Sequence, residues 1–162
     1  KAIRFQESDV RPMGRTAAGV RGIRVAEGHE VIALLIIGQG EVLTATEKGY
    51  GKRTGVSEFP VQGRGGQGVI AIQTSDRNGR MVGAIQVRDE DEIVLISSSG
   101  TLVRTPVADV SQQGRNTQGV RLIQLEEGDH LVSVARLAER VDDDESLGDP
   151  AGGGPGASKE DP

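Results

Sequence analysis

The sequence predicts an all-β, propeller-like domain made of about three repeats of roughly fifty residues. Two recurrences predict it: a glycine- and arginine-rich segment occurs three times, at spacings of 49 and 51 residues, and a hairpin-like segment occurs twice, 51 residues apart. No convincing helical periodicity interrupts them, and four short strands at this period are typical of a propeller blade. We expect three four-stranded blades near residues 1–46, 47–97 and 98–140, which together form one domain over residues 1–140.

The glycine- and arginine-rich segments, termed Gly-Arg loops, occupy residues 14–20, 63–69 and 114–120. Each begins with Gly-Arg and ends with Gly-Val. The first and third repeats match without a gap at an offset of 100 residues, as in the pair Arg4 and Arg104. Agreement over this length indicates true internal repeats.

Strands are expected on both sides of each loop. Residues 42–54 and 93–105 each contain two β-rich runs around a turn that ends in Gly, which predicts a hairpin. Residues 1–5 match the second arm of such a hairpin, and the chain starts without Met, so we expect it to be part of a larger protein. After the loops, alternating segments predict half-buried strands, and apolar runs predict the last strand of each repeat. The alternating segments are residues 20–25, 69–72 and 120–125, and the apolar runs are residues 31–36, 81–87 and 131–137.

Composition limits the core and the chemistry. Aromatic residues make up 2% of the chain and cysteine is absent, so the core must be aliphatic, and disulfides and thiolate metal sites are excluded. The longest apolar run, residues 31–37, is far shorter than the roughly 20 residues that a membrane-spanning helix needs. The net charge of −5 is uneven, because residues 1–138 carry +1 and the rest carry −6. Residues 141–162 are acidic and rich in glycine, which predicts a disordered tail.

Four motifs resemble the C-terminal domain of the DNA gyrase A subunit, and more distantly that of the topoisomerase IV A subunit. They lie at residues 10–14, 48–54, 103–105 and 114–120, and the similarity covers residues 1 to about 140. The resemblance implies a six-bladed β-pinwheel, of which this chain holds the last three blades and the acidic tail. It also implies a basic rim that wraps double-stranded DNA without reading its sequence. The wrapping would support ATP-dependent negative supercoiling by the whole enzyme, a type IIA topoisomerase.

The resemblance further implies partners and a location. The partners are DNA and the remainder of the gyrase A and B subunits, with no membrane, and the location is the bacterial cytoplasm at the nucleoid. ATP and Mg²⁺ belong to the parent complex, so no cofactor, metal or catalytic residue is expected in this chain. The family's cleavage tyrosine and ATP site lie elsewhere, since Tyr50, the only tyrosine, does not match the cleavage position.

Wrapping DNA requires cations spaced along a curved surface, since each neutralised phosphate releases counterions. The repeats supply cations at matching positions on the hairpin arm, in the Gly-Arg loop and on the segment that follows it. The candidate DNA-binding residues are Arg4, Arg15, Arg21, Arg24, Lys48, Lys52, Arg53, Arg64, Arg104, Arg115 and Arg121.

Two interpretations of these cations remain open. We expect phosphate contact above all from Lys52, Arg53 and Arg104. The arginines of the Gly-Arg loops are equally compatible with structural pairing to acids that recur with them. These loop arginines are Arg15, Arg64 and Arg115, and the recurring acids are Asp9, Glu58 and Asp109.

The second Gly-Arg loop resembles the family's marker motif, Gln-Arg-Arg-Gly-Gly-Lys-Gly, at five of seven positions. The loop consists of Gln62, Gly63, Arg64, Gly65, Gly66, Gln67 and Gly68. Gly63 and Gln67 replace two cations of the motif, so we expect a related structure with weaker DNA affinity. The same glycines fit a dinucleotide fingerprint, but that fingerprint requires a helix after them, and residues 69–72 alternate as a strand.

Other candidate chemistry is weaker. His29 and His130 stand in polar turns, and the acidic run at residues 89–92 has no second carboxylate cluster in register, so neither predicts a metal site.

The alternative function is a propeller that acts as a protein interaction platform without DNA affinity. Two questions stay open: whether the acidic tail competes with DNA for the basic rim, and whether the half ring folds alone, needs further blades or associates with a second copy.

Overall fold

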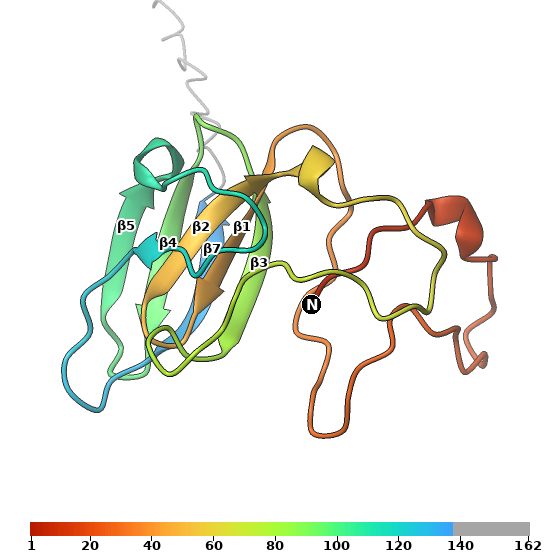
Figure 1. The fold of residues 1–162 in the computed structure, drawn as a ribbon, viewed down its shortest axis with the longest axis horizontal. Helices are drawn as coiled ribbons and strands as arrows, with labels where there is room; N and C mark the ends of the chain where they lie inside the picture. Colours follow the sequence, from red (N-terminus) through yellow and green to blue (C-terminus); the bar gives the residue numbers. More distant parts are fainter. Residues whose placement is uncertain (138–162) are drawn as a thin grey trace, which may run out of the picture.

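The computed structural model describes residues 1–137, which form β-strands, short turns and loops (Figure 1). These residues contain no α-helix. Three short 3₁₀ turns, η1 (Glu7–Asp9), η2 (Val56–Glu58) and η3 (Val107–Asp109), precede the Gly-Arg loops at matching positions. No helix in this range is long and apolar enough to cross a membrane. The end of the third predicted blade and the acidic tail, residues 138–162, lie outside the described residues.

The second repeat, which by its strand pairing runs from residue 41 to residue 91 and so starts before the expected boundary near residue 47, forms an antiparallel sheet with the strand order β3-β1-β2-β6. β1 (Glu41–Thr46) and β2 (Tyr50–Gly55) form the first predicted hairpin, and β3 (Met81–Val87) is the predicted apolar run. The fourth strand, β6 (Val120–Arg121), comes from the third repeat and pairs with β2. Neighbouring repeats are therefore joined by backbone hydrogen bonds within one sheet.

The third repeat, which by its strand pairing starts at residue 92, before the expected boundary near residue 98, forms a second antiparallel sheet with the order β5-β4-β7. β4 (Glu92–Ser97) and β5 (Leu102–Pro106) form the second predicted hairpin. β7 (Leu131–Leu137) pairs with β4 along its length, which confirms the predicted strand at residues 131–137.

The two sheets lie face to face and share one aliphatic core (Figure 1). Leu43 on β1, Ile93 and Leu95 on β4, and Leu131 on β7 are all 0% exposed. Along β4 the buried residues alternate with partly exposed ones, as expected for a strand that turns one face toward the core. The aliphatic core expected from the composition is confirmed.

The first repeat is left with residues 1–40, because β1 pairs within the second; these residues contain no strand and run as loops beside the sheets (Figure 1). The predicted strands at residues 20–25 and 31–36 are therefore wrong. β3 and β7 each pair with the first arm of a hairpin, but none of the described residues supplies such an arm for residues 31–36. Leu34 and Ile36 are consequently 86% and 92% exposed.

The segments after the other two Gly-Arg loops also form less strand than predicted. Residues 69–72 contribute a single bridge, between Val69 and Ala2, and residues 120–125 contribute only the two residues of β6. The all-β propeller-like fold is confirmed. The described residues nevertheless form one four-stranded and one three-stranded sheet instead of three four-stranded blades.

Candidate nucleic-acid interface

Two predicted DNA-binding arginines on the hairpin arms hold neighbouring repeats together. Arg4 Nη1 donates a hydrogen bond to the carbonyl of Phe59 at 3.3 Å, and Arg53 Nε donates to the carbonyl of Val110 at 2.7 Å. Arg4 matches Arg53 between repeats, and Phe59 matches Val110, so the same contact occurs at both junctions. The side chains of Arg4 and Arg53 are therefore turned toward the next repeat, away from solvent.

The loop arginines form a second contact that also recurs. Arg64 Nη1 donates to the carbonyl of Arg21 at 2.5 Å, and Arg115 Nη1 donates to the carbonyl of Ile70 at 2.9 Å. Each of these arginines reaches back from its Gly-Arg loop to the preceding repeat. The structure therefore shows structural roles for Arg64 and Arg115. Their hydrogen-bond partners are backbone carbonyls, however, and not the recurring acids.

Lys52 is fully buried, contrary to the expectation that it contacts phosphate. Its Nζ donates to the carbonyls of Gly114 and Arg115, each at 2.5 Å, and to Thr117 Oγ1 at 3.0 Å. Burial lowers the pKa of Lys52 to about 8, and repulsion from Arg115 adds to this effect, while Glu58 opposes it. The ammonium group is surrounded by the third Gly-Arg loop, where a phosphate of external DNA cannot reach it.

Arg53 and Arg104, the other two preferred candidates, form ion pairs. Arg53 Nη1 lies 3.0 Å from Glu41 and also pairs with Asp89, and its side chain is only 13% exposed. Arg104 pairs with Glu92 but remains 65% exposed. Of the three preferred cations, only Arg104 is placed where DNA could reach it.

Exposed cations gather instead around the ring of Tyr50, at the turn end of the β1–β2 hairpin. The guanidinium carbons of Arg77 and Arg121 lie 5.0 and 5.5 Å from the ring centre, and Arg121 Nη2 donates to Tyr50 Oη at 3.1 Å. Lys48, exposed on the hairpin turn, donates through Nζ to the carbonyl of Asp76. We name Lys48, Tyr50, Arg77 and Arg121 the Tyr50 cluster.

The electrostatics of the Tyr50 cluster fit an anion site. The hydrogen bond from Arg121, followed by that from Arg77, lowers the pKa of Tyr50. Stacking on one ring holds the two guanidinium planes in place, and each retains N–H groups that can bind a phosphate oxygen. The cluster joins the second and third repeats, because Tyr50 lies on β2 and Arg121 on β6.

The family model described as "DNA gyrase C-terminal domain, beta-propeller" matches residues 1–37, 40–88 and 91–138. The chain belongs to this gyrase C-terminal domain family. It is 55% identical over 149 residues to the DNA gyrase A subunit of Pseudomonas aeruginosa, with 91% of this chain and 16% of that protein covered. It is 51% identical over 146 residues to the gyrase A protein of Escherichia coli K12, with 90% of this chain and 17% of that protein covered.

Solved structures agree with this assignment. A gyrase A C-terminal domain superposes with a TM-score of 0.72 at 32% identity, over 83% of this chain and 46% of that one. The C-terminal domain of a DNA topoisomerase IV superposes with a TM-score of 0.75 at 29% identity, over 82% of this chain and 42% of that one. The chain spans about a sixth of the length of the curated gyrase A proteins that it matches.

Arg77 is the member of the cluster that the sequence prediction missed. That prediction starts from cations that recur between gyrase-type repeats and adds only the nearby Lys48, Lys52 and Arg24, whereas the positions matching Arg77 are the glycines Gly28 and Gly128. Arg80, exposed in the same loop, was missed for the same reason. The sequence signal that indicates them is the presence of two arginines within the four-residue turn at residues 77–80.

The remaining candidates lie on the first repeat of this gyrase-type domain. Arg15, Arg21 and Arg24 are exposed there, and the backbone N–H of Arg24 donates to the carbonyl of Gly66 at 2.8 Å. The box-like loop that contains Gly66 is itself anchored on the first repeat, because Gln62 N–H donates to the carbonyl of Arg4 at 2.8 Å. Val69 follows this loop as a bridge residue and not in a helix, which excludes the dinucleotide interpretation.

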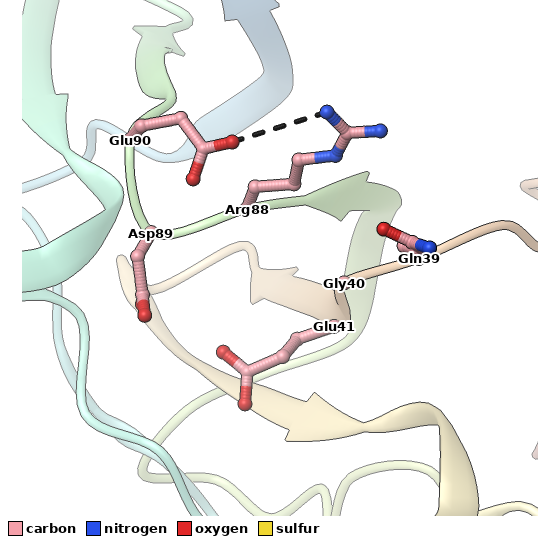
Figure 2. A pocket seen from close by; sticks show the side chains of 6 residues that line it. All are labelled: Gln39, Gly40, Glu41, Arg88, Asp89 and Glu90. Carbon is pink, nitrogen blue, oxygen red and sulfur yellow. Dashed lines mark ion pairs between the residues drawn. The ribbon is translucent and has the colours of Figure 1, made fainter.

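Acidic side chains occupy the opposite end of the second repeat, around the turn after β3. Figure 2 shows Glu41 and Asp89 pointing toward the same space, with Arg88 paired to Glu90 at 3.9 Å. Arg53 bridges Glu41 and Asp89. Residues 1–137 contain no group of three side chains able to hold a metal ion. The second repeat of this domain therefore has a basic end and an acidic end.

Proposed function

We propose that this chain binds double-stranded DNA without reading its sequence and helps to wrap it as part of a gyrase A protein. Membership of the gyrase C-terminal domain family supports this proposal. The observation that carries it is the Tyr50 cluster, in which the exposed Arg77 and Arg121 lie over one tyrosine ring and Lys48 is exposed on the adjacent hairpin turn. No base-reading element is required, because phosphate contacts supply affinity independent of sequence.

The structure supports a division of labour among the cations. Arg4, Arg53, Arg64 and Arg115 bind backbone carbonyls of neighbouring repeats and so join one repeat to the next. Lys48, Arg77 and Arg121 would then bind phosphates at the junction of the second and third repeats. Arg15, Arg21 and Arg24 would extend the contact along the first repeat. This arrangement resembles other wrapping proteins, in which cations on a curved surface meet successive phosphates.

The wider role follows from the gyrase A relatives. In a complete enzyme, the wrapped DNA would support ATP-dependent negative supercoiling, with the remainder of gyrase A and gyrase B as partners. ATP and Mg²⁺ would act in those other parts. The setting would be the bacterial cytoplasm, at the nucleoid. Self-association of the half ring stays a prediction.

The salt dependence of DNA binding tests the proposal. The variant Lys48→Gln/Arg77→Gln/Arg121→Gln should bind a random-sequence duplex more weakly than wild type. Its slope of log K against log[salt] should be smaller by about 2 to 3, because each phosphate that the variant no longer neutralises removes about 0.9 from the slope. Arg88→Gln/Arg136→Gln removes exposed cations that pair with Glu90 and Asp91 at the acidic end, and it should leave the slope unchanged.

Two outcomes would contradict the proposal. If the wild-type chain does not bind DNA at low salt, a protein interaction platform becomes the better explanation. If the slope decreases equally in the triple variant and the acidic-end variant, the Tyr50 cluster is not the binding surface.

A further inference from the structure

Two adjacent residues of the second repeat have opposite surroundings. Arg77 is exposed and lies over the ring of Tyr50, whereas Asn78 is 0% exposed. Both belong to residues 73–79, which we name the Arg77 loop. A buried amide side chain needs hydrogen-bond partners inside the protein, so the partners of Asn78 show which segments this residue joins.

The side chain of Asn78 uses both of its N–H donors and its oxygen. Nδ2 donates to the carbonyl of Gln73 at 2.7 Å and to that of Gln118 at 3.1 Å, and Oδ1 accepts from the backbone N–H of Ser75 at 2.8 Å. Gln73 and Ser75 lie in the Arg77 loop itself, but Gln118 lies in the third Gly-Arg loop. One side chain therefore closes the Arg77 loop and ties it to the next repeat.

A short chain of hydrogen bonds runs from Asn78 to the backbone of Arg77. The hydroxyl of Ser75 donates to Asn78 Oδ1 at 3.4 Å, and the same oxygen accepts from the backbone N–H of Arg77 at 3.2 Å. Because Asn78 is anchored on the carbonyl of Gln118, the position of Arg77 depends on the Gly-Arg loop of the neighbouring repeat.

The same Gly-Arg loop also places the second guanidinium over the ring. Arg121 directly follows this loop and pairs, on β6, with Tyr50 on β2. The two cations over Tyr50 thus depend on one segment of the third repeat. Arg121 depends on it through the chain itself, and Arg77 depends on it through the side chain of Asn78.

Backbone hydrogen bonds tie the Arg77 loop to the rest of the protein near its two ends. At the start, Gln73 N–H donates to the carbonyl of Thr117 at 2.9 Å, and at the other end Lys48 N–H donates to the carbonyl of Asn78 at 3.2 Å. Between these ends, the side chain of Asn78 supplies the contact from the interior. Without this side chain the loop stays attached, but Arg77 can move away from the ring.

The sequence supports a link between Arg77 and Asn78. Neither residue occurs at the matching positions of the other two repeats, which hold Gly28-His29 and Gly128-Asp129. Among the three repeats, the cation and the amide beside it therefore occur together in the second repeat and in no other.

We propose that Asn78 is the positioning residue of the Tyr50 cluster. Its side chain joins the Arg77 loop to the third Gly-Arg loop and thereby holds the guanidinium of Arg77 over the ring, where it can bind a phosphate oxygen. The role in DNA binding rests on the proposed function, whereas the placement of Arg77 does not.

Titration of Tyr50 in the 162-residue chain tests this placement, because Arg121 and Arg77 both lower the pKa of Tyr50. Asn78→Ala should raise that pKa as far as Arg77→Gln does. The two substitutions together should raise it no further than Arg77→Gln alone, since Asn78 acts through Arg77. An unchanged pKa in Asn78→Ala overturns the proposal, as does a double variant in which the two effects add.

Thr54→Val is the matched control for a loss of stability. Thr54 is also 0% exposed, and its Oγ1 donates to the carbonyl of Gln113 at 2.9 Å, so it joins the same two repeats outside the Arg77 loop. This variant should lower the unfolding midpoint and leave the pKa of Tyr50 unchanged. A rise as large as that of Asn78→Ala would assign the effect to general destabilisation and overturn the proposal.

Ser75→Ala serves if Asn78→Ala does not fold. Ser75 is exposed, and the substitution removes the hydroxyl that links Asn78 to the backbone of Arg77. The pKa of Tyr50 should rise in this variant as well, by less than in Arg77→Gln. In that case an unchanged pKa overturns the proposal.

DNA binding separates this inference from the proposed function. Asn78→Ala should raise the dissociation constant for a random-sequence duplex by about 2- to 5-fold, the range expected for one exposed charge contact. A raised pKa of Tyr50 with unchanged DNA affinity would support the placement of Arg77 by Asn78 and contradict the Tyr50 cluster as a DNA site. An unchanged pKa overturns the positioning role, whatever the affinity.

Discussion

Gly119 and Gly51 approach so closely that a Cβ on Gly119 would lie 2.5 Å from the carbonyl oxygen of Gly51. Their contact belongs to the junction where β6 joins β2, and thus holds the third repeat against the second. Gly119→Ala should lower the free energy of unfolding by about 2 to 4 kcal/mol, because the methyl group adds a backbone clash to the cost of a left-handed conformation. Denaturant unfolding measures this change.

The control for this prediction is Gly28→Ala, in which only the backbone cost applies. Gly28 has φ of 74° and no atom within 4 Å of a Cβ position. This variant should lose about 1 to 2 kcal/mol. Equal losses in the two variants would show that the closeness of Gly119 to Gly51 has no energetic consequence.

Arg115 should contribute to stability and not to DNA affinity. Its Nη1 donates to the carbonyl of Ile70 at 2.9 Å across the junction, and a hydrogen bond to a charged group of this kind stabilises by roughly 1.5 to 3 kcal/mol. Arg115→Gln should therefore lower the unfolding midpoint but keep the salt slope of DNA binding. Arg121→Gln should show the reverse pattern, and a shared pattern would argue against separate roles.

Stability should depend on pH through Lys52. The folded pKa is lowered to about 8 from 10.5, so between these values the unfolded chain holds a proton that the folded chain has lost. The free energy of unfolding should consequently rise with pH across this window, by on the order of 1 to 3 kcal/mol from this group.

The comparison that isolates this effect is Lys52→Met against Lys48→Met. Both variants remove one lysine of the same hairpin, but Lys48 is exposed. Unfolding at about pH 7 and about pH 10 should show the increase in wild type and Lys48→Met, and a smaller one in Lys52→Met. An equal increase in all three proteins would assign the pH dependence to other groups.

Tyr50 should ionise below the ordinary pKa of a tyrosine, because Arg121 and Arg77 stabilise its phenolate. It is the only tyrosine and the chain has no tryptophan, so near-ultraviolet absorbance follows its titration directly. Arg121→Gln should raise the pKa of Tyr50. Arg80→Gln, which removes another exposed arginine of the same loop, should leave it unchanged, and a shift as large as that of Arg121→Gln would refute the specific contact.

Much of the fold could be predicted because its causes are local and repeat along the chain. The hairpin turns ending in Gly49 and Gly100 predicted β1–β2 and β4–β5, and the apolar runs predicted β3 and β7. Residues 31–36 have the same apolar character but form no strand, since a strand needs a partner and none of the described residues provides it. An apolar, strand-like sequence is therefore not enough to form a strand; whether a neighbouring strand is available for pairing decides it.

The candidate site could be predicted less well, because recurrence does not distinguish a cation that joins two repeats from one that is exposed for binding DNA. Arg4, Arg53, Arg64 and Arg115 recur since each junction needs the same bond to a carbonyl. Arg77 does not recur, yet it lies exposed over the ring of Tyr50. A search that starts from matching positions therefore favours the structural cations over Arg77.

The sequence by itself determined the period, the hairpins, the aliphatic core and the family, because these depend on residue order and composition. Only the tertiary structure decided which cations face solvent. Lys52 and Lys48 lie on the same hairpin, and one is enclosed by the third Gly-Arg loop while the other is exposed. The difference arises from segments more than sixty residues away, which pack over Lys52 and form hydrogen bonds with its ammonium group.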